Sequence, residues 1–482
     1  MRKAIQPLVI ALVILPFLAF DLFAGGSLLV RNARLVDGTD APVQEGVSVL
    51  IQNGRIAKIG KNLSSRGTPE LDVGGSYVLP GLIDGHVHLD WGPGVLINNY
   101  DTPQSIKEWE ATWGKNVSQY LRAYLACGVT TVLNASAPAF VIQDIRRGLE
   151  KGNPGPRFLS VGQLFSPPKG YAAGKQNKPV SSHEEAETKL DVMQSLGVIG
   201  IKVPIEKGWS PFGDLPRHSP DMLRAIKEGA AQRNLPIYVH ATCEEDFSTA
   251  LDMKPHALMH TLVSRGKEQL SKSFIERMAS TKTYQVSTLS IMDAALASYE
   301  ISRLNEPLLE IVVPESELAR ARDPIAVDNI RKLFVSKQLP WLPKVFLNFF
   351  VNVFYGKEGI MKSLQNSKKA IYDLHKAGVN IVMGSDAVPN NAAIYSFHGF
   401  TSLREIELLG EAGLSPKEAI KAATVNTATM VGLEREIGTI EVGKRADLVV
   451  LRDNPLKNLT AFRTVRWTIK DGIAKTPKEW MN

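Results

Sequence analysis

The stretch Gly81-Leu82-Ile83-Asp84-Gly85-His86-Val87-His88 is the starting point for the fold. In a β-strand, residues i and i+2 point to the same side, so His86 and His88 project together. Two neutral imidazoles on one side can bind one metal ion. An HxH pair alone is a weak signal, because any half-buried strand can contain it by chance. Its meaning therefore depends on the segments around it.

Outward from this stretch, helical and strand-like segments alternate. Helical patterns cover residues 116–126, 181–196, 219–233 and 366–377, and apolar runs follow at 129–133, 199–203, 236–239 and 380–383. Repeated βα units predict a parallel sheet in an α/β protein. Residues 80–436 have a length that suits a TIM-type (β/α)8 barrel with insertions. A doubly wound open sheet is the alternative, but the Gly-rich phosphate loop that favours it is missing after the first strand.

Further polar residues coincide with the ends of these apolar runs. His240, His260 and Asp386 each follow one of the predicted strands, and Lys202 lies inside Gly200-Ile201-Lys202-Val203-Pro204. Barrel enzymes place catalytic groups at the carboxyl ends of several strands. We therefore expect these side chains to meet His86 at one face.

Lys202 has two interpretations. A buried ammonium is costly without a partner, so the side chain can reach the barrel rim and pair with Glu206 or Asp386. Alternatively, burial lowers the lysine pKa and favours carbamylation by carbon dioxide, which turns the amine into an anionic bridge between two cations.

The two ends of the sequence share a β-rich texture. Short β-branched runs occur at residues 27–34, 47–51 and 55–59, with the hairpin signal Asn53-Gly54 between the last two. Similar runs at 446–451 and 465–469 precede Asp471-Gly472. We predict that residues 25–79 and 437–482 complete one small sheet domain.

The first 24 residues have the layout of a secretory signal peptide. Arg2 and Lys3 precede an uncharged, mostly apolar run from residue 4 to 20, and small residues follow. The run is short for a membrane span. A periplasmic or secreted protein is expected, with an uncleaved N-terminal anchor as the alternative.

The composition excludes several classes of protein. With 44% hydrophobic and 22% charged residues, the 482-residue chain is too apolar for disorder and too mixed for a membrane bundle. Its net charge of +7 comes without a Lys/Arg-rich block, so no nucleic-acid partner is expected. Two cysteines, Cys127 and Cys243, cannot form a disulfide framework.

Residues 296–365 do not fit a simple barrel and are expected to form a helical insertion. Within them, the run from 339 to 355 (LPWLPKVFLNFFVNVFY) is strongly apolar. The insertion can pack on the barrel, or it can act as a lid or touch a membrane.

Taken together, the sequence resembles the metal-dependent amidohydrolases, most closely the imidazolonepropionase-like and Xaa-Pro dipeptidase-like branch. The matching stretches are residues 78–88, 126–132, 240–241, 384–387, 414–424 and 438–450. The main gap is the 296–365 insertion. The resemblance implies a distorted TIM barrel plus a β-sandwich built from both chain ends.

The resemblance also implies six metal ligands: His86, His88 and Asp386 at one divalent ion, His240 and His260 at a second, and carbamylated Lys202 between them. Zinc is the expected metal, with Mn, Fe or Ni as alternatives. Asp386 would take a proton from the activated water and pass it to the leaving amine. Without carbamylation, the site would hold one metal and His260 would contact substrate or water.

Some positions depart from the resemblance. Strand 129–133 ends in Asn134, where many relatives have a charged residue, and Ser287-Thr288-Leu289 lacks the proline of the related Pro-Thr-Leu pattern. Specificity is expected from loops 166–175, which includes Tyr171, and 209–218. With Tyr171, the candidate substrate contacts are Cys243 and His398; packing inside the protein is the simpler interpretation of Cys243.

The sequence thus predicts an exported amidohydrolase that cleaves small amides such as dipeptides, N-acyl amino acids or cyclic amides. Deamination or lactone hydrolysis would use the same machinery. A different class, a catalytically silent binding protein with the same fold, is the remaining alternative. The expected partner is a small-molecule substrate, and a homo-oligomer or membrane proximity stays open.

Overall fold

The computed structural model describes residues 25–90, 103–174, 177–208, 214–263, 269–338, 343–388 and 394–482. The predicted signal peptide, residues 1–24, lies outside these ranges. Among the helices of the described ranges, none combines the length and the apolarity needed to cross a membrane.

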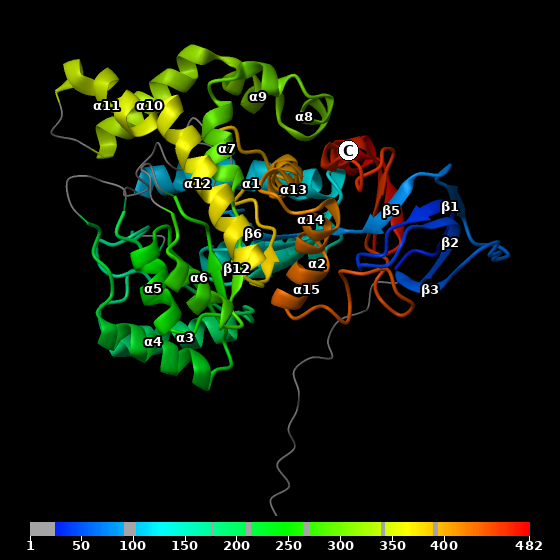
Figure 1. Ribbon diagram of the computed structural model, residues 1–482, viewed down its shortest axis with the longest axis horizontal. Helices are drawn as coiled ribbons and strands as arrows, with labels where there is room; N and C mark the ends of the chain where they lie inside the picture. Colours follow the sequence, from blue (N-terminus) through cyan, green and yellow to red (C-terminus); the bar gives the residue numbers. More distant parts are fainter. Residues whose placement is uncertain are drawn as a thin grey trace, which may run out of the picture.

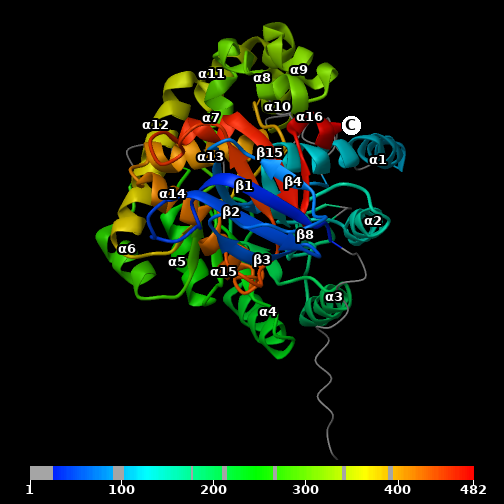
Figure 2. The ribbon, with the colours of Figure 1, turned by 90° about the vertical axis from the view of Figure 1, so that its right-hand side faces the viewer.

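Both ends of the chain contribute to one eight-stranded sheet, which lies at one end of the molecule (Figures 1 and 2). Its order is β16-β15-β14-β5-β1-β2-β3, with β4 against β1. The strands are β1 (Leu28–Leu35), β2 (Gln44–Gln52), β3 (Arg55–Gly60), β4 (Glu70–Asp72), β5 (Tyr77–Pro80), β14 (Leu448–Leu451), β15 (Val465–Lys470) and β16 (Ile473–Lys475). The sharing of one sheet by both chain ends is confirmed, while its description as a sandwich stays a prediction.

The turn between β2 and β3 forms where the sequence predicts it. Asn53 and Gly54 adopt φ values of 51° and 73°. Two successive residues with positive φ match the right-handed twist of the flanking strands, and asparagine and glycine tolerate that conformation best.

Two parallel sheets make up the middle of the chain. The three-stranded sheet β6-β7-β8 comprises β6 (Leu82–Val87), β7 (Val129–Asn134) and β8 (Arg157–Ser160). The five-stranded sheet, in the order β13-β12-β11-β10-β9, comprises β9 (Ile201–Pro204), β10 (Ile237–His240), β11 (Ala257–Met259), β12 (Tyr284–Val286) and β13 (Ile381–Val382). Single parallel bridges, Leu164 to Lys202 and Val87 to Ala387, connect the sheets. The prediction of parallel sheets in an α/β protein is confirmed.

Helices alternate with these strands and pack around them (Figure 1). They are α1 (Pro103–Ala126), α2 (Ala139–Glu150), α3 (His183–Ser195), α4 (Pro220–Gln232), α5 (Glu244–Asp252), α6 (Lys272–Ala279), α7 (Ser290–Ala297), α12 (Lys357–Lys376), α13 (Phe400–Glu411), α14 (Pro416–Ala422), α15 (Val425–Met430) and α16 (Pro477–Met481). Ser182 and Ser219 cap α3 and α4 by accepting backbone N–H hydrogen bonds. All four helices and all four strands predicted for this region are present.

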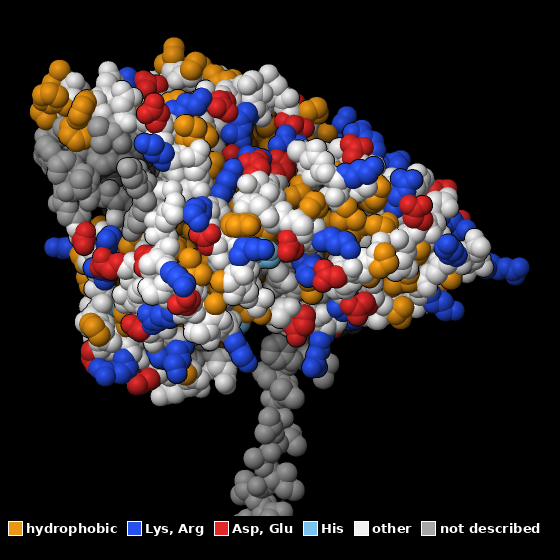
Figure 3. All heavy atoms as spheres, viewed as in Figure 1, with side chains coloured by type: hydrophobic (Ala, Val, Ile, Leu, Met, Phe, Trp, Pro, Cys, Tyr) orange, Lys and Arg blue, Asp and Glu red, His pale blue; other side chains and the backbone are white. Residues whose placement is uncertain are grey.

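The predicted insertion is helical in its described part. It follows β12 and α7 and comprises α8 (Pro307–Val312), α9 (Glu315–Arg322), α10 (Pro324–Gln338) and α11 (Leu347–Tyr355) before α12 returns to β13. Val345, Phe346 and Phe349 are 79%, 52% and 62% exposed. Hydrophobic side chains gather on the surface at the upper left of Figure 3, where α10 and α11 lie. Residues 339–342 of the apolar run lie outside the described ranges.

Candidate metal centre and active site

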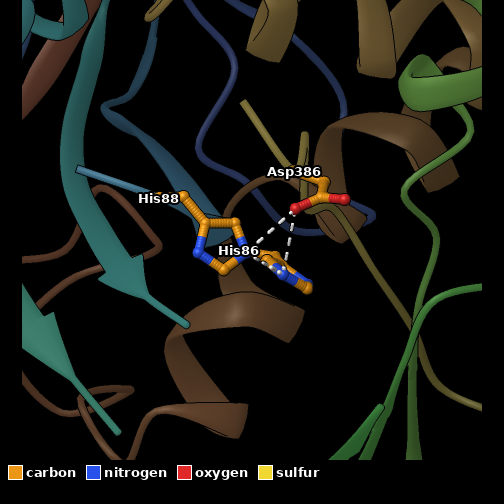
Figure 4. A group of neighbouring side chains, drawn as sticks. All are labelled: His86, His88 and Asp386. Atoms are coloured by element: carbon orange, nitrogen blue, oxygen red, sulfur yellow. Dashed lines mark hydrogen bonds and ion pairs between the residues drawn. The ribbon is translucent and has the colours of Figure 1, made fainter. Parts of the chain in front are cut away.

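His86 and His88 lie side by side, as their spacing on β6 predicts. Their Nε2 atoms are 3.2 Å apart, and Asp386 Oδ1 lies 3.2 Å from each of them (Figure 4). One ligand atom from each of these three residues lies within 4.8 Å of the other two. We call His86, His88 and Asp386 the first half-site. Two imidazoles and a carboxylate in this arrangement fit a divalent cation such as zinc.

The backbone brings Asp386 to this position. Its amide donates to the carbonyl oxygen of His86 at 2.7 Å, and its φ of 48° lies in the left-handed region. Gly384 makes the approach possible, because a Cβ atom there would lie 2.7 Å from the His86 Cβ. A left-handed non-glycine residue costs of order 1–3 kcal/mol, so surrounding contacts must hold it.

Asp84 supplies several of those contacts. Its carboxylate accepts hydrogen bonds from the backbone of His86 and Ser385 at 3.1 and 3.0 Å, and from Ser402 Oγ at 2.6 Å. Burial raises the pKa of Asp84 to about 6, although these donors oppose the shift. The sequence analysis missed this role. The available signal was that Asp84 precedes His86 by two residues and shares its side of β6.

Lys202, His240 and His260 form the second half-site, at three neighbouring strands. Lys202 lies within β9, His240 ends β10, and His260 follows β11. The rings of His240 and His260 have centroids 4.4 Å apart, and His260 lies 4.7 Å from the His86 ring. Among the described His, Cys, Asp and Glu residues, His240 and His260 belong to no further group of three ligand atoms as compact as the first half-site. All six predicted residues therefore lie around one place, and the three of the first half-site form a compact group of ligand atoms.

Lys202 faces the first half-site. Its Nζ lies 3.2 Å from His86 Nε2, while the carboxylate of Glu206 contacts His240 and Thr242. Burial lowers the pKa of Lys202 to about 8, against the attraction of Asp386. This lowered pKa increases the fraction of neutral amine near pH 7, and the neutral amine is the form that reacts with carbon dioxide.

A second buried carboxylate supports His260. Thr288 Oγ1 lies 3.1 Å from His260 Nδ1, and Thr288 has a φ of 42°. The turn around it is held by Glu405, which accepts from the backbone of Leu289 and Ser290 at 3.0 and 2.6 Å. Ser287, at the position where the related pattern has proline, also donates to Glu405. Burial raises the pKa of Glu405 to about 7.

The protonation states suit metal binding. Burial lowers the pKa of His86 to about 3, so its imidazole is neutral near pH 7. Burial alone would raise the pKa of Asp386, but hydrogen bonds from the imidazoles of His86 and His88 hold it well below its usual range. The carboxylates of Asp386 and Asp90 raise the pKa of His88 against its burial. A neutral imidazole, as at His86, and an ionised carboxylate, as at Asp386, are the forms that coordinate cations.

The predicted substrate contacts lie in different surroundings. The ring of Tyr171 stacks on His240 with centroids 4.0 Å apart. His398 is buried against Tyr120 and Tyr124, and its Nδ1 lies 2.9 Å from the Tyr124 hydroxyl. Cys243 is buried and its thiol contacts Asp246 Oδ2 at 3.3 Å; burial raises its pKa to about 12. Tyr171 thus borders the second half-site, whereas the Cys243 thiol is protonated and engaged locally.

Asn134 has a local structural role. Its Oδ1 accepts from the backbone of Leu89 at 2.7 Å, and its Nδ2 donates to Ser136 at 2.6 Å. The side chain therefore fixes the segment that follows His88.

A cavity of about 590 Å³ lies elsewhere, among α7, α12 and α13. None of the six converging residues lines it. Its charged lining is paired, for example Arg404 with Asp293 at 3.0 Å. Its lining chemistry therefore differs from that of the metal centre.

Comparisons with known proteins agree with this geometry. The sequence model of the amidohydrolase family matches residues 77–474, so the chain belongs to the amidohydrolase family. By this membership it is a hydrolase acting on carbon–nitrogen bonds.

Individual relatives are distant or match only in part. Imidazolonepropionase of Symbiobacterium thermophilum is 40% identical over 74 residues, 15% of this chain and 16% of that protein. The 5-methylthioadenosine/S-adenosylhomocysteine deaminase of Caldanaerobacter subterraneus subsp. tengcongensis is 22% identical over 88% of this chain and 84% of its own length. A solved Xaa-Pro dipeptidase with bound methionine has a TM-score of 0.69 at 20% identity, covering 94% of this chain and all of that one. The last likeness concerns the fold alone.

Proposed function

We propose that the protein hydrolyses the amide bond of a small substrate, such as a dipeptide, an N-acyl amino acid or a cyclic amide. The observation that carries this proposal is the meeting of His86, His88 and Asp386 with ligand atoms within 4.8 Å of one another. Such a buried cluster at strand ends is where barrel enzymes perform their chemistry.

The first half-site would hold one divalent cation, most simply zinc. A bound cation supplies the charge that lowers the pKa of water and polarises a carbonyl group. Asp386 is ionised near neutral pH and borders both imidazoles at 3.2 Å. We assign it the proton transfer: its carboxylate accepts the proton of the attacking water and returns it to the leaving nitrogen.

The second half-site would hold a second cation if Lys202 is carbamylated. As an ammonium group beside His86, Lys202 repels cations. As a carbamate it would offer two anionic oxygens between the half-sites. Its burial and its pKa of about 8 support this modification. Tyr171, stacked on His240, is assigned to substrate contact, with His398 as a further candidate near the mouth.

Deamination is the second candidate reaction, because the likeness to a deaminase extends over 88% of this chain. A catalytically silent binding protein is less favoured, since the full set of candidate ligands converges. Lactone hydrolysis, which would use the same ligands, stays a further alternative. A closed (β/α)8 barrel is supported by the two bridges that join the parallel sheets. Export, directed by residues 1–24, is also proposed, and the exposed residues of the insertion leave membrane contact or a homo-oligomer as further proposals.

The test is metal content combined with a substrate panel. The purified protein would be loaded with zinc or manganese and tested on dipeptides that include Xaa-Pro, on N-acyl amino acids, on cyclic amides and on adenosine derivatives. We expect amide hydrolysis that a chelator abolishes and metal restores. A protein that binds no metal, and stays inert after zinc or manganese loading, would overturn the proposal.

A further inference from the structure

The imidazole of His240 contacts a buried carboxylate, Glu206, which is not one of the six predicted metal ligands. Glu206 and His240 are 2% and 3% exposed. His240 Nε2 lies 3.2 Å from Glu206 Oε2. Glu206 follows β9, the strand of Lys202, so two neighbouring strands bring the pair together.

Two other groups fix the carboxylate of Glu206. Thr242 Oγ1 donates to Oε2 at 2.6 Å, and the backbone amide of Gly208 donates to Oε1 at 2.6 Å. An ionised carboxylate only accepts hydrogen bonds. His240 must therefore donate, which places a proton on Nε2 and leaves the lone pair of Nδ1 free of that proton in the neutral ring.

The faces of the His240 ring are also restrained. Tyr171 stacks on it with a 26° interplanar angle, and His260 meets it edge-on at 72°. These contacts resist rotation of the imidazole. In the first half-site, by contrast, the Nε2 atoms of His86 and His88 face Asp386.

We propose that Glu206 is a positioning residue that fixes His240 as the Nε2–H tautomer and presents its Nδ1 to the second metal position. The inference rests on the proposed metal centre. A hydrogen bond from a ligating histidine to a carboxylate orients the ring and increases its basicity, and its loss commonly weakens metal binding about 10–100-fold.

The first measurement needs neither metal nor activity. Long-range ¹H–¹⁵N spectra of the metal-free protein, with the His240 signals assigned by comparison with His240→Asn, report which nitrogen carries the proton. We expect the Nε2–H form in the wild type and in Glu206→Gln, whose amide oxygen can still accept. Glu206→Leu removes the acceptor and should give a mixture or the other tautomer. A wild-type His240 protonated only at Nδ1 would overturn the proposal.

The second measurement is zinc affinity by chelator competition. Glu206→Leu should weaken the second equivalent about 10–100-fold while the first is unchanged, and Glu206→Gln should recover most of the loss. Thr242→Val removes one hydrogen-bond donor to Glu206 and should weaken binding of the second equivalent in the same direction but by less. It replaces Glu206→Leu as the test if that variant does not fold. Unchanged binding of the second equivalent in both Glu206→Leu and Thr242→Val would also overturn the proposal. If the wild type binds no second equivalent, the two-metal centre fails, while the tautomer measurement still decides the role of Glu206.

Discussion

The two half-sites differ in how far the polypeptide assembles them. In the first, His86 and His88 share one strand, and the backbone amide of Asp386 binds the carbonyl of His86. In the second, Lys202, His240 and His260 lie on or directly after three different strands, and the Lys202 ammonium contacts His86 of the first half-site. Local backbone geometry thus organises the first half-site, whereas the second depends on side chains from three strands and, in our proposal, on carbamylation of Lys202.

The strongest test of this difference is Asp386→Asn. The variant loses a proton acceptor and an anionic ligand from the first half-site. We therefore expect kcat to fall at least about 10³-fold, the middle of the range that a general acid or base contributes. Steady-state kinetics and metal analysis would measure both losses. Retained activity would remove Asp386 from the chemistry, and an unchanged metal content would remove it from the ligands.

The pH dependence of the free energy of unfolding tests the role of Glu405, which holds the turn beside His260. Glu405 has a pKa of about 7, raised by burial from 4.5. Between these values the unfolded chain is ionised and the folded protein keeps the proton, so the wild type loses stability as pH rises. The loss approaches about 3 kcal/mol by pH 7 at 1.36 kcal/mol per unit. Urea unfolding at several pH values should show a steeper loss of stability in the wild type than in Glu405→Gln, which keeps only the contribution of groups such as Asp84; equal slopes would contradict the assignment.

Lys202→Ala tests whether the second half-site needs Lys202 to bind metal while the first does not. Without the bridging group, the second zinc equivalent should bind at least about 10²-fold more weakly while the first is kept. Mass spectrometry of the wild type should show the mass of one added carbon dioxide under native conditions. Unchanged stoichiometry and activity in the variant would refute the bridge.

Thr288→Ala should have the smallest effect. It removes the hydroxyl at 3.1 Å from His260 Nδ1, and we expect about a 10-fold weaker second equivalent, at the lower end for an outer-shell partner. Thr288→Ser keeps the hydroxyl and is the matched control. Equal affinities of the two variants would show that this contact does not orient His260.

Much of the first half-site and its surroundings was predictable from the sequence. The i, i+2 spacing of His86 and His88 sets their common direction, and apolar runs before His240, His260 and Asp386 mark strand ends. The same periodicities located the βα units and the β-rich chain ends. Most boundaries moved by a few residues, but α1 begins at Pro103 instead of residue 116 and α12 at Lys357 instead of residue 366, because both helices extend beyond their clearest apolar pattern.

The supporting carboxylates were less predictable, because their partners are distant in sequence. Glu405 lies on α13 yet binds the turn after β12, and no local pattern marks that contact. Glu206 was visible near Lys202, but its actual partner, His240, depends on how β9 and β10 align. The exposure of Phe346 and Phe349 likewise follows from how α10 and α11 pack, which apolarity alone does not specify.

The sheet shared by the two chain ends also constrains the order of synthesis and folding. β5 leads directly into β6, yet its neighbour β14 is synthesised long after both of them. Until then, the strand that anchors His86 has an open edge, and closing it requires contacts across almost the whole sequence. Such distant pairing slows folding and exposes unpaired strands to aggregation. Nascent chains that stall before residue 448 should therefore depend most on chaperones.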